Sequence, residues 1–279
     1  MSEKKTFFAS LQPRSALLVG AVAGILAICT IGFIIMGVIY LRGDSDDAGS
    51  NTSTSTATAT NIVDQQQPVA VEVTKTDKPK VELFIMSYCP YGLQMQKAFL
   101  PVMELLKSKA DMDVKWVSYI MHGKKEIDEN DRQYCIQKEQ NDKYLAYATC
   151  FTGKDDYSAC LKTAQIDESK MNACIKATDS QYKTTEKYND KSTWLSGNYP
   201  VYLVHGEANT NYQVGGSPTL VINGTQVQVS RTPEAVKSAV CSSFTTTPDE
   251  CAKTLSTSAA VPGFGTEVGT DTAGVDCEG

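Results

Sequence analysis

One stretch of this chain, residues 81–106, constrains its fold more than any other: VELFIMSYCPYGLQMQKAFLPVMELL. Leu83 to Met86 is an unbroken apolar run, which favours a central strand covered on both faces. Cys89 follows, and Pro90 suits the first turn of a helix because its missing N–H is no loss there. Apolar residues then recur at helical spacing. The stretch therefore predicts a strand, a cysteine at a helix N-cap and a helix.

The predicted position of Cys89 favours chemical reactivity. A helix N-terminus presents free N–H groups and positive dipole, which stabilise a thiolate and can lower a cysteine pKa below about 8.5. The thiolate is the nucleophile in disulfide exchange. The alternative is an inert or structurally bridged cysteine.

The order of strand, Cys89-Pro90-Tyr91-Gly92 and helix resembles the thioredoxin superfamily, in particular the glutaredoxin-type Cys-Pro-Tyr-Cys motif and the DsbA-like group. Gly92 stands where the second cysteine of that motif belongs. An exchange confined to these four residues is therefore excluded, because they cannot close a disulfide of their own.

A second segment, Gly216-Ser217-Pro218-Thr219, resembles the cis-proline loop of the same superfamily. In that superfamily the loop lies against the nucleophilic cysteine and pairs with extended substrate backbone, so we expect Ser217–Pro218 to be cis and to face Cys89. The resemblance implies that Cys89 and Pro218 are catalytic. It implies substrate-binding roles for Pro90, Tyr91, Ser217 and Thr219.

The remaining elements support an α/β thioredoxin-like fold with a helical insert. Residues 113–121 are rich in β-branched and aromatic residues and read as a second strand, parallel to the first. Residues 124–190 are helical in pattern, with Asp167 as one N-cap. Asn223-Gly224 predicts a tight hairpin between residues 220–222 and 225–227. Thr232 caps a last helix that runs to about Phe244.

Residues 15–41 carry no charge and are long enough to span the ~30 Å hydrocarbon layer of a membrane as a helix. A cleaved signal peptide would have a shorter apolar region and end in small residues, whereas Val38 to Arg42 follows here. Basic residues precede the span and aspartates follow it, so the N-terminus is expected in the cytoplasm and the rest outside. Cys29 lies within the span as a small apolar residue.

These features divide the chain. We expect a cytoplasmic N-terminus (1–14), a transmembrane helix (15–41), a Ser/Thr-rich linker (42–80), a thioredoxin-like domain (81–251) with its insert at about 124–190, and a flexible tail (252–279). The net charge of −6 and the scattered basic residues argue against a nucleic-acid partner.

Eight of the nine cysteines lie outside the predicted membrane span. An even number of cysteines in an exported segment indicates an oxidising compartment. Proximity along the chain predicts three structural disulfides: Cys135–Cys150, Cys160–Cys174 and Cys241–Cys251. A zinc site is disfavoured because there is no Cys-x2-Cys pair and His122 and His205 are isolated. No metal and no other cofactor is expected.

If those three bridges form, Cys89 and Cys277 are the cysteines left outside the membrane. The tail from Ala252 to Asp276 could stretch about 80 Å, enough to return Cys277 to the helix start. A tethered thiol acts at an effective concentration near millimolar, so Cys277 is a candidate resolving thiol for Cys89. The alternative is an incidental terminal cysteine or an intermolecular bridge.

Two functions stay open on the sequence alone. One is a membrane-tethered, extracytoplasmic thiol-disulfide oxidoreductase or isomerase that acts on the thiols or disulfides of exported proteins through Cys89, with a membrane redox partner as one source of electrons. The other is a non-catalytic thioredoxin-fold module that binds an extended peptide. The second is kept because residues 160–251 also resemble part of the plant vacuolar sorting receptors.

Overall fold

The structure is a computed structural model and describes residues 72–270 and 276–278. The predicted membrane span, 15–41, lies outside these ranges. Within them, no helix is long and apolar enough to cross a membrane.

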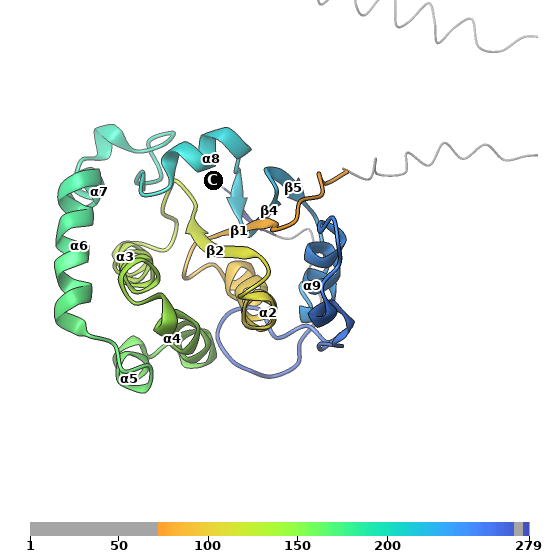
Figure 1. Cartoon of the computed structure of the whole chain (residues 1–279). Helices are drawn as coiled ribbons and strands as arrows, with labels where there is room; N and C mark the ends of the chain where they lie inside the picture. Colours follow the sequence, from red (N-terminus) through yellow and green to blue (C-terminus); the bar gives the residue numbers. More distant parts are fainter. Residues whose placement is uncertain (1–71, 271–275, 279) are drawn as a thin grey trace, which may run out of the picture. The chain divides into compact units, whose positions relative to one another are not determined.

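The helices and strands of the described residues follow one another along a single domain (Figure 1). Their order is β1 Lys80–Ile85, α2 Pro90–Leu106, β2 Asp111–Trp116, α3 Lys124–Glu139, α4 Asn141–Lys154, α5 Tyr157–Thr163, α6 Glu168–Tyr182, α7 Thr184–Asn189, α8 Gly206–Tyr212, β3 Gly216–Ser217, β4 Thr219–Ile222, β5 Thr225–Val227, α9 Pro233–Ser242 and β6 Cys277–Glu278.

The central sheet has the strand order β2-β1-β4-β5. β1 runs parallel to β2, with Leu83 opposite Val114, and antiparallel to β4, with Leu83 opposite Leu220. β4 and β5 form the predicted hairpin, and Asn223 and Gly224 have the positive φ values, 48° and 81°, that a type I′ turn requires. This order and these directions are those of a thioredoxin-like fold, as predicted.

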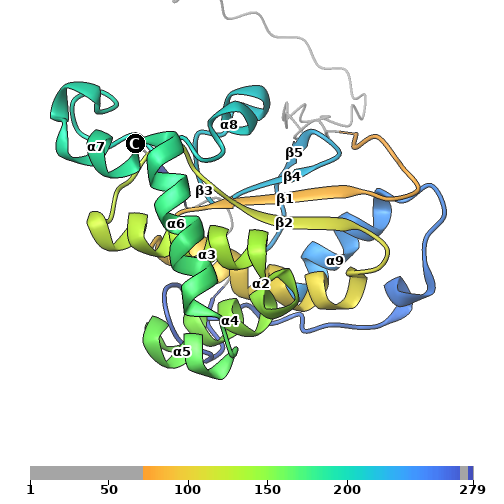
Figure 2. The ribbon, with the colours of Figure 1, turned by 60° about the vertical axis from the view of Figure 1, so that its left-hand side comes forward.

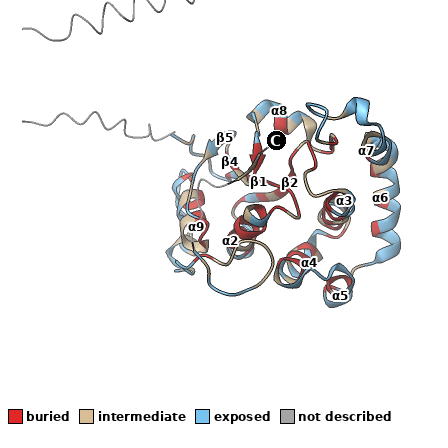
Figure 3. Ribbon diagram, turned by 180° about the vertical axis from the view of Figure 1, so that it is seen from behind, coloured by how far each residue is buried: buried red, intermediate tan, exposed pale blue. Residues whose placement is uncertain are grey.

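Helices cover both faces of the sheet (Figures 1 and 2). α2 and α9 lie on one face and α8 on the other. β1 contributes side chains to the hydrophobic cores on both faces of the sheet. Leu83 and Ile85 belong to the larger core, while Phe84 and Met86 belong to the smaller core under α8. Figure 3 shows the buried residues concentrated where these layers meet. α8 lies in a stretch for which the sequence analysis predicts no helix.

The insert predicted at about 124–190 is present as α3 to α7. One buried hydrogen bond joins it to α2, since the Gln96 amide donates to Gln133 at 2.9 Å. Another joins α4 to α3 within the insert, since the Tyr147 hydroxyl donates to Glu129 at 2.9 Å. Burial raises the pKa of Glu129 to about 7, against the opposing effect of Arg132. The predicted N-caps are confirmed, since Asp167 accepts from the Lys170 N–H and Thr232 from the Ala235 N–H.

Three expectations about element boundaries need correction. β2 is shorter than predicted and ends at Trp116, because the Ser118 N–H donates to the side chain of Asn209 instead of to a strand. The last helix, α9, ends at Ser242. The domain begins before residue 81, since Thr76, placed in the linker by its sequence, pairs with Phe244.

Two of the predicted disulfide pairings are wrong, although all six cysteines are bridged and Cys241–Cys251 is confirmed. The structure pairs Cys135 with Cys174 and Cys150 with Cys160. Asp155, with a left-handed φ of 49°, ends α4 and lets α5 turn back onto it, which brings Cys150 and Cys160 together. α6 then runs along α3, so Cys174 meets Cys135.

Candidate functional site

Cys89 lies at the N-cap of α2, directly after the central strand, as predicted. Its Sγ accepts a hydrogen bond from the Gly92 N–H at 3.3 Å, and its side chain is fully buried. Pro90 occupies the first helical position. A backbone N–H directed at sulfur stabilises negative charge there, so the local geometry suits a thiolate when Cys89 is reduced.

The cis-proline loop faces this cysteine. The Ser217–Pro218 peptide bond is cis, as the resemblance implied, and the Ser217 carbonyl oxygen lies 3.3 Å from Cys89 Sγ. The Ser217 hydroxyl accepts from the Met86 N–H at 2.9 Å, which joins the loop to the end of β1. Thr219 closes the loop by donating from its hydroxyl to the Gly216 carbonyl at 2.9 Å.

Gly92 is the glycine that this close approach requires. A Cβ atom at position 92 would lie 2.5 Å from Ser217 Oγ and 3.1 Å from the Met86 carbonyl oxygen. Any side chain there, a cysteine included, would push against the cis-proline loop. The missing second cysteine is thus matched by a loop that occupies its space.

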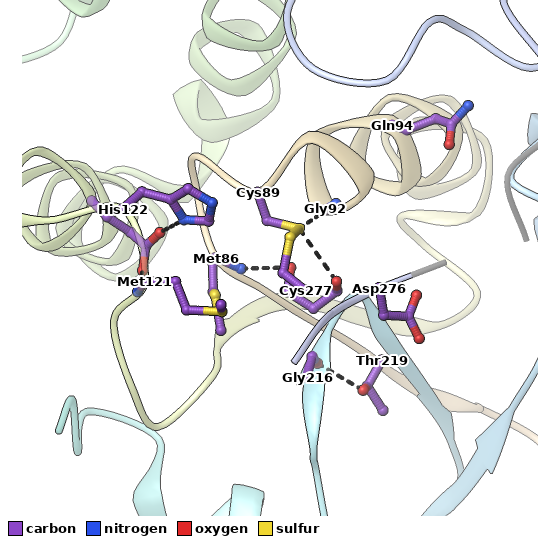
Figure 4. The surroundings of a disulfide bond; sticks show 12 residues. Met86, Cys89, Gly92, Gln94, Met121, His122, Gly216, Thr219, Asp276 and Cys277 are labelled. Atoms are coloured by element: carbon purple, nitrogen blue, oxygen red, sulfur yellow. Dashed lines mark hydrogen bonds and ion pairs between the residues drawn. A yellow bond between two sulfur atoms is a disulfide. The ribbon is translucent and has the colours of Figure 1, made fainter. Parts of the chain in front are cut away.

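Cys277 forms a disulfide with Cys89 across 188 residues, with a Cα–Cα distance of 6.3 Å (Figure 4). The strand that carries it, β6, pairs antiparallel with β3, so that Cys277 lies opposite Ser217 and Glu278 opposite Gly216. The C-terminus therefore occupies the edge of the cis-proline loop as an extended strand, with its sulfur bonded to the predicted nucleophile.

An ion pair holds the residue before Cys277. Asp276 Oδ1 lies 2.5 Å from the guanidinium of Arg231, whose side chain is only 4% exposed. The guanidinium lies over the Tyr91 ring, 5.4 Å from its centroid, and 3.5 Å from Gln94 Oε1. Sequence reasoning missed Arg231, Gln94 and Asp276, because residues so far apart in the chain show no common motif.

The segment that leads to β6 also differs from expectation. The sequence predicts a flexible tail over 252–279, but residues 259–270 lie on α2 and the insert. Lys97 Nζ donates to the carbonyl oxygens of Val261, Gly263 and Gly265 at 2.7, 2.8 and 2.9 Å. The Phe264 ring packs edge-on against Phe151, with ring centroids 5.2 Å apart. Backbone carbonyls bind Lys97 here, which composition alone could not reveal.

Each of the two histidines contacts a neighbouring protein group. His122 contacts Glu126 through Nδ1. His205 Nδ1 accepts from the Trp116 N–H at 3.1 Å, and burial, aided by Lys115, lowers the pKa of His205 to about 3. Over residues 72–270 and 276–278, no cluster of histidine, cysteine and carboxylate side chains could hold a metal ion.

The predicted site residues thus lie in one place. Cys89 and Cys277 form the disulfide, and around it lie Tyr91, Ser217, Pro218 and Thr219. Pro90 contributes its carbonyl oxygen, which accepts from the Gly263 N–H at 2.8 Å. This arrangement can make and break a disulfide at Cys89 and can pair an extended chain along β3.

No family model matches the chain, and no curated protein matches it. Among solved structures it is similar to the reduced DsbA of Mycobacterium tuberculosis, at 16% identity and a TM-score of 0.44, covering 64% of this chain and 94% of that one.

It is also similar to the reduced DsbG of Mycobacterium tuberculosis, a disulfide bond oxidoreductase, at 16% identity and a TM-score of 0.42, covering 64% of this chain and 89% of that one. The thiol-disulfide oxidoreductase MdbA of Actinomyces oris shows 16% identity and a TM-score of 0.37 over 61% of this chain and 83% of its own. The fold assignment depends on the strand order and directions described above.

Proposed function

We propose that this chain is a thiol-disulfide oxidoreductase or isomerase of exported proteins, whose redox pair is Cys89 and Cys277. The observation that carries the proposal is the bond between these two residues at the N-terminus of α2, beside the cis-proline loop. Cys277 supplies from the tail the partner that Gly92 cannot supply from the motif.

The reaction is a two-step exchange. In the reduced chain the Cys89 thiolate attacks a substrate disulfide; a bond forms between Cys89 and one substrate sulfur, and the other substrate sulfur leaves as a thiolate. The Cys277 thiolate then attacks Cys89 Sγ, forms the bond seen in the structure and releases the second substrate thiolate. Two electrons pass to the substrate, whose sulfurs take up the two protons that the cysteines lost. The reverse sequence oxidises a substrate dithiol, and the direction follows from the two reduction potentials.

The binding-module alternative uses the same edge without covalent chemistry. β6 on β3 is in itself an extended segment bound to the cis-proline loop, which is what that alternative requires. The disulfide favours exchange, because a module that only binds peptides needs no sulfur at the end of its bound strand. The two functions differ in whether Cys89–Cys277 opens under mild reduction.

The proposal includes the tether and the compartment. Residues 15–41 would hold the domain at the membrane, with residues 1–14 in the cytoplasm and the domain outside, periplasmic or extracellular. There the domain would meet exported protein thiols and disulfides, and a membrane redox partner could exchange electrons with Cys89–Cys277. Proteolysis of intact cells or spheroplasts checks this: removal of the domain from the outer side is expected, and its protection would contradict the orientation.

Graded glutathione buffers test the chemistry. After equilibration, free thiols are alkylated and located by mass spectrometry in the folded full chain. We expect Cys89 and Cys277 to be reduced together at a poise where Cys135–Cys174, Cys150–Cys160 and Cys241–Cys251 stay closed, since structural disulfides resist the glutathione pool. Opening of Cys89–Cys277 only together with the other three would overturn the proposal.

A trapping variant provides the second arm. Cys277→Ser removes the resolving thiol, so a substrate disulfide should remain bonded to Cys89, while the parent releases it. Cys89→Ser is the matched control and should trap nothing. Equal trapping by the parent and Cys277→Ser would mean that an external thiol resolves Cys89.

A further inference from the structure

β6 lies where a substrate strand has to lie. A substrate cysteine bonded to Cys89 takes the place of Cys277, because both sulfurs must meet the same Sγ atom. The backbone around it has the same strand edge, β3, with which β6 pairs. The contacts of Asp276 therefore indicate which side chain the site receives directly before a bonded cysteine.

The position directly before that cysteine has a charged partner. Asp276 precedes Cys277, and its carboxylate contacts Arg231. Arg231 reaches this position from the segment between β5 and α9, far from β6 in sequence, so the contact depends on the fold and not on chain proximity. Any residue in the place of Asp276 would meet the same guanidinium.

Residues of α2 hold Arg231 in place. Tyr91 and Gln94, both on α2, hold its guanidinium from two directions. With the tail in place the whole residue is only 3% exposed, so a group that replaces Asp276 meets a guanidinium with little access to water. A carboxylate offers a hydrogen bond between two charged groups there, an amide offers only a neutral acceptor and hence a weaker bond, and a lysine brings like charge.

We propose that the site selects cysteines directly preceded by aspartate or glutamate, in a protein or peptide, and that Arg231 recognises this carboxylate. The inference deepens the proposed function and rests on it. In this arrangement Asp276-Cys277 is an internal copy of the preferred sequence. The tail competes with the substrate for Arg231 and for Cys89, and closes the site after each exchange.

Activated peptides test this selection on the reduced full chain. The probe is a peptide with the sequence of residues 275–279, its cysteine linked to 5-thio-2-nitrobenzoate; the counterparts carry Asn or Lys at the aspartate. Attack by the Cys89 thiolate on the peptide sulfur bonds the two and releases the coloured thiolate, which gives the rate. Rates are divided by those with free glutathione, because the neighbouring charge also changes the peptide's intrinsic reactivity.

We expect the aspartate peptide to react about tenfold faster than the asparagine peptide, the factor that a charge-assisted hydrogen bond of ordinary strength supplies. The lysine peptide should be slower still. Arg231→Gln should bring the aspartate-to-asparagine ratio close to one. Asp276→Asn is the matched control: it keeps Arg231, so the ratio should persist while the tail competes less well.

The failures of the two proposals are separable. Equal rates for all three peptides with the parent, or the same ratio in the parent and Arg231→Gln, would overturn the selection while leaving the exchange chemistry intact. No reaction at Cys89 with any peptide would overturn the proposed function itself. If Arg231→Gln does not fold, the comparison of the three peptides on the parent still decides the matter.

Discussion

Gly92 shows how one residue couples the motif to the loop opposite. Its hydrogen atom leaves room for Ser217 Oγ, and that oxygen in turn accepts from the Met86 N–H. Position 92 therefore serves packing, and a disulfide partner for Cys89 has to come from outside the motif. Cys277 is the residue that the structure brings to Cys89.

Gly92→Ala is expected to lower the free energy of unfolding by about 1–3 kcal/mol, because the new methyl group overlaps Ser217 Oγ. Ser217→Ala alone leaves the buried Met86 N–H without its acceptor, which costs about 1–3 kcal/mol. In the double variant the new methyl group no longer overlaps Ser217 Oγ, so the loss in unfolding free energy should be smaller than the sum of the two single losses. Denaturant unfolding of the four proteins measures this, and strict additivity would contradict the contact.

His205 predicts a pH dependence of stability. The folded domain keeps the imidazole neutral, with its pKa lowered from 6.5 to about 3 by burial. Below about pH 6.5 the unfolded chain binds a proton that the folded domain does not, so stability falls as pH drops towards 3. The difference in unfolding free energy between the parent and His205→Gln should change by about 1.4 kcal/mol per pH unit between pH 6 and 4. A constant difference would show that His205 titrates normally.

At the scale of elements, two disulfides have different structural tasks. Cys150–Cys160 joins the consecutive helices α4 and α5 over 10 residues, whereas Cys135–Cys174 joins α3 to α6 over 39. The longer bridge encloses α4 and α5, so it fixes how the insert closes. The buried Thr178 on α6 lies against this bridge, with its hydroxyl oxygen 3.7 Å from Cys135 Sγ.

Removing the longer bridge should therefore destabilise the domain more. Loop-closure entropy amounts to about 4 kcal/mol for Cys135–Cys174 and about 3 kcal/mol for Cys150–Cys160. Paired Cys→Ala variants of each, compared by denaturant unfolding, measure the two losses. A larger loss for Cys150–Cys160 would mean that strain or residual structure dominates over loop length.

At the scale of the whole domain, residues 259–270 lie on α2, and β6 lies beside Cys89. Lys97 holds this segment through three carbonyl oxygens. The docking shortens the stretch of chain between the docked segment and Cys277, so in the proposed exchange it raises the effective concentration of Cys277 at Cys89.

Lys97→Met should free this segment and make Cys89–Cys277 easier to reduce. We expect the equilibrium constant for closing the disulfide, measured in glutathione buffers, to fall about three- to tenfold, the range for one or two lost hydrogen bonds. Lys107→Met is the control, because Lys107 ends the same helix and contacts only the nearby Glu104 among the contacts described for it. An unchanged constant in a folded Lys97→Met variant would show that docking does not assist closure.

The sequence by itself determined the elements whose signals are local. The strand before Cys89, the N-caps at Asp167 and Thr232 and the Asn223-Gly224 turn each depend on a few neighbouring residues, and all appear in the structure. The superfamily resemblance also led to the cis peptide bond before Pro218 and to its place against Cys89.

Only the tertiary structure decided which distant residues meet. The pairing of Cys135 with Cys174 depends on how helices cross, and the docking of residues 259–270 depends on backbone carbonyls that look alike in every sequence. The tail is long enough for Cys277 to meet Cys89, but its length alone does not determine where Cys277 binds on the domain. The strand edge of β3 and the buried Arg231 make that selection, because both exist only once the chain has folded.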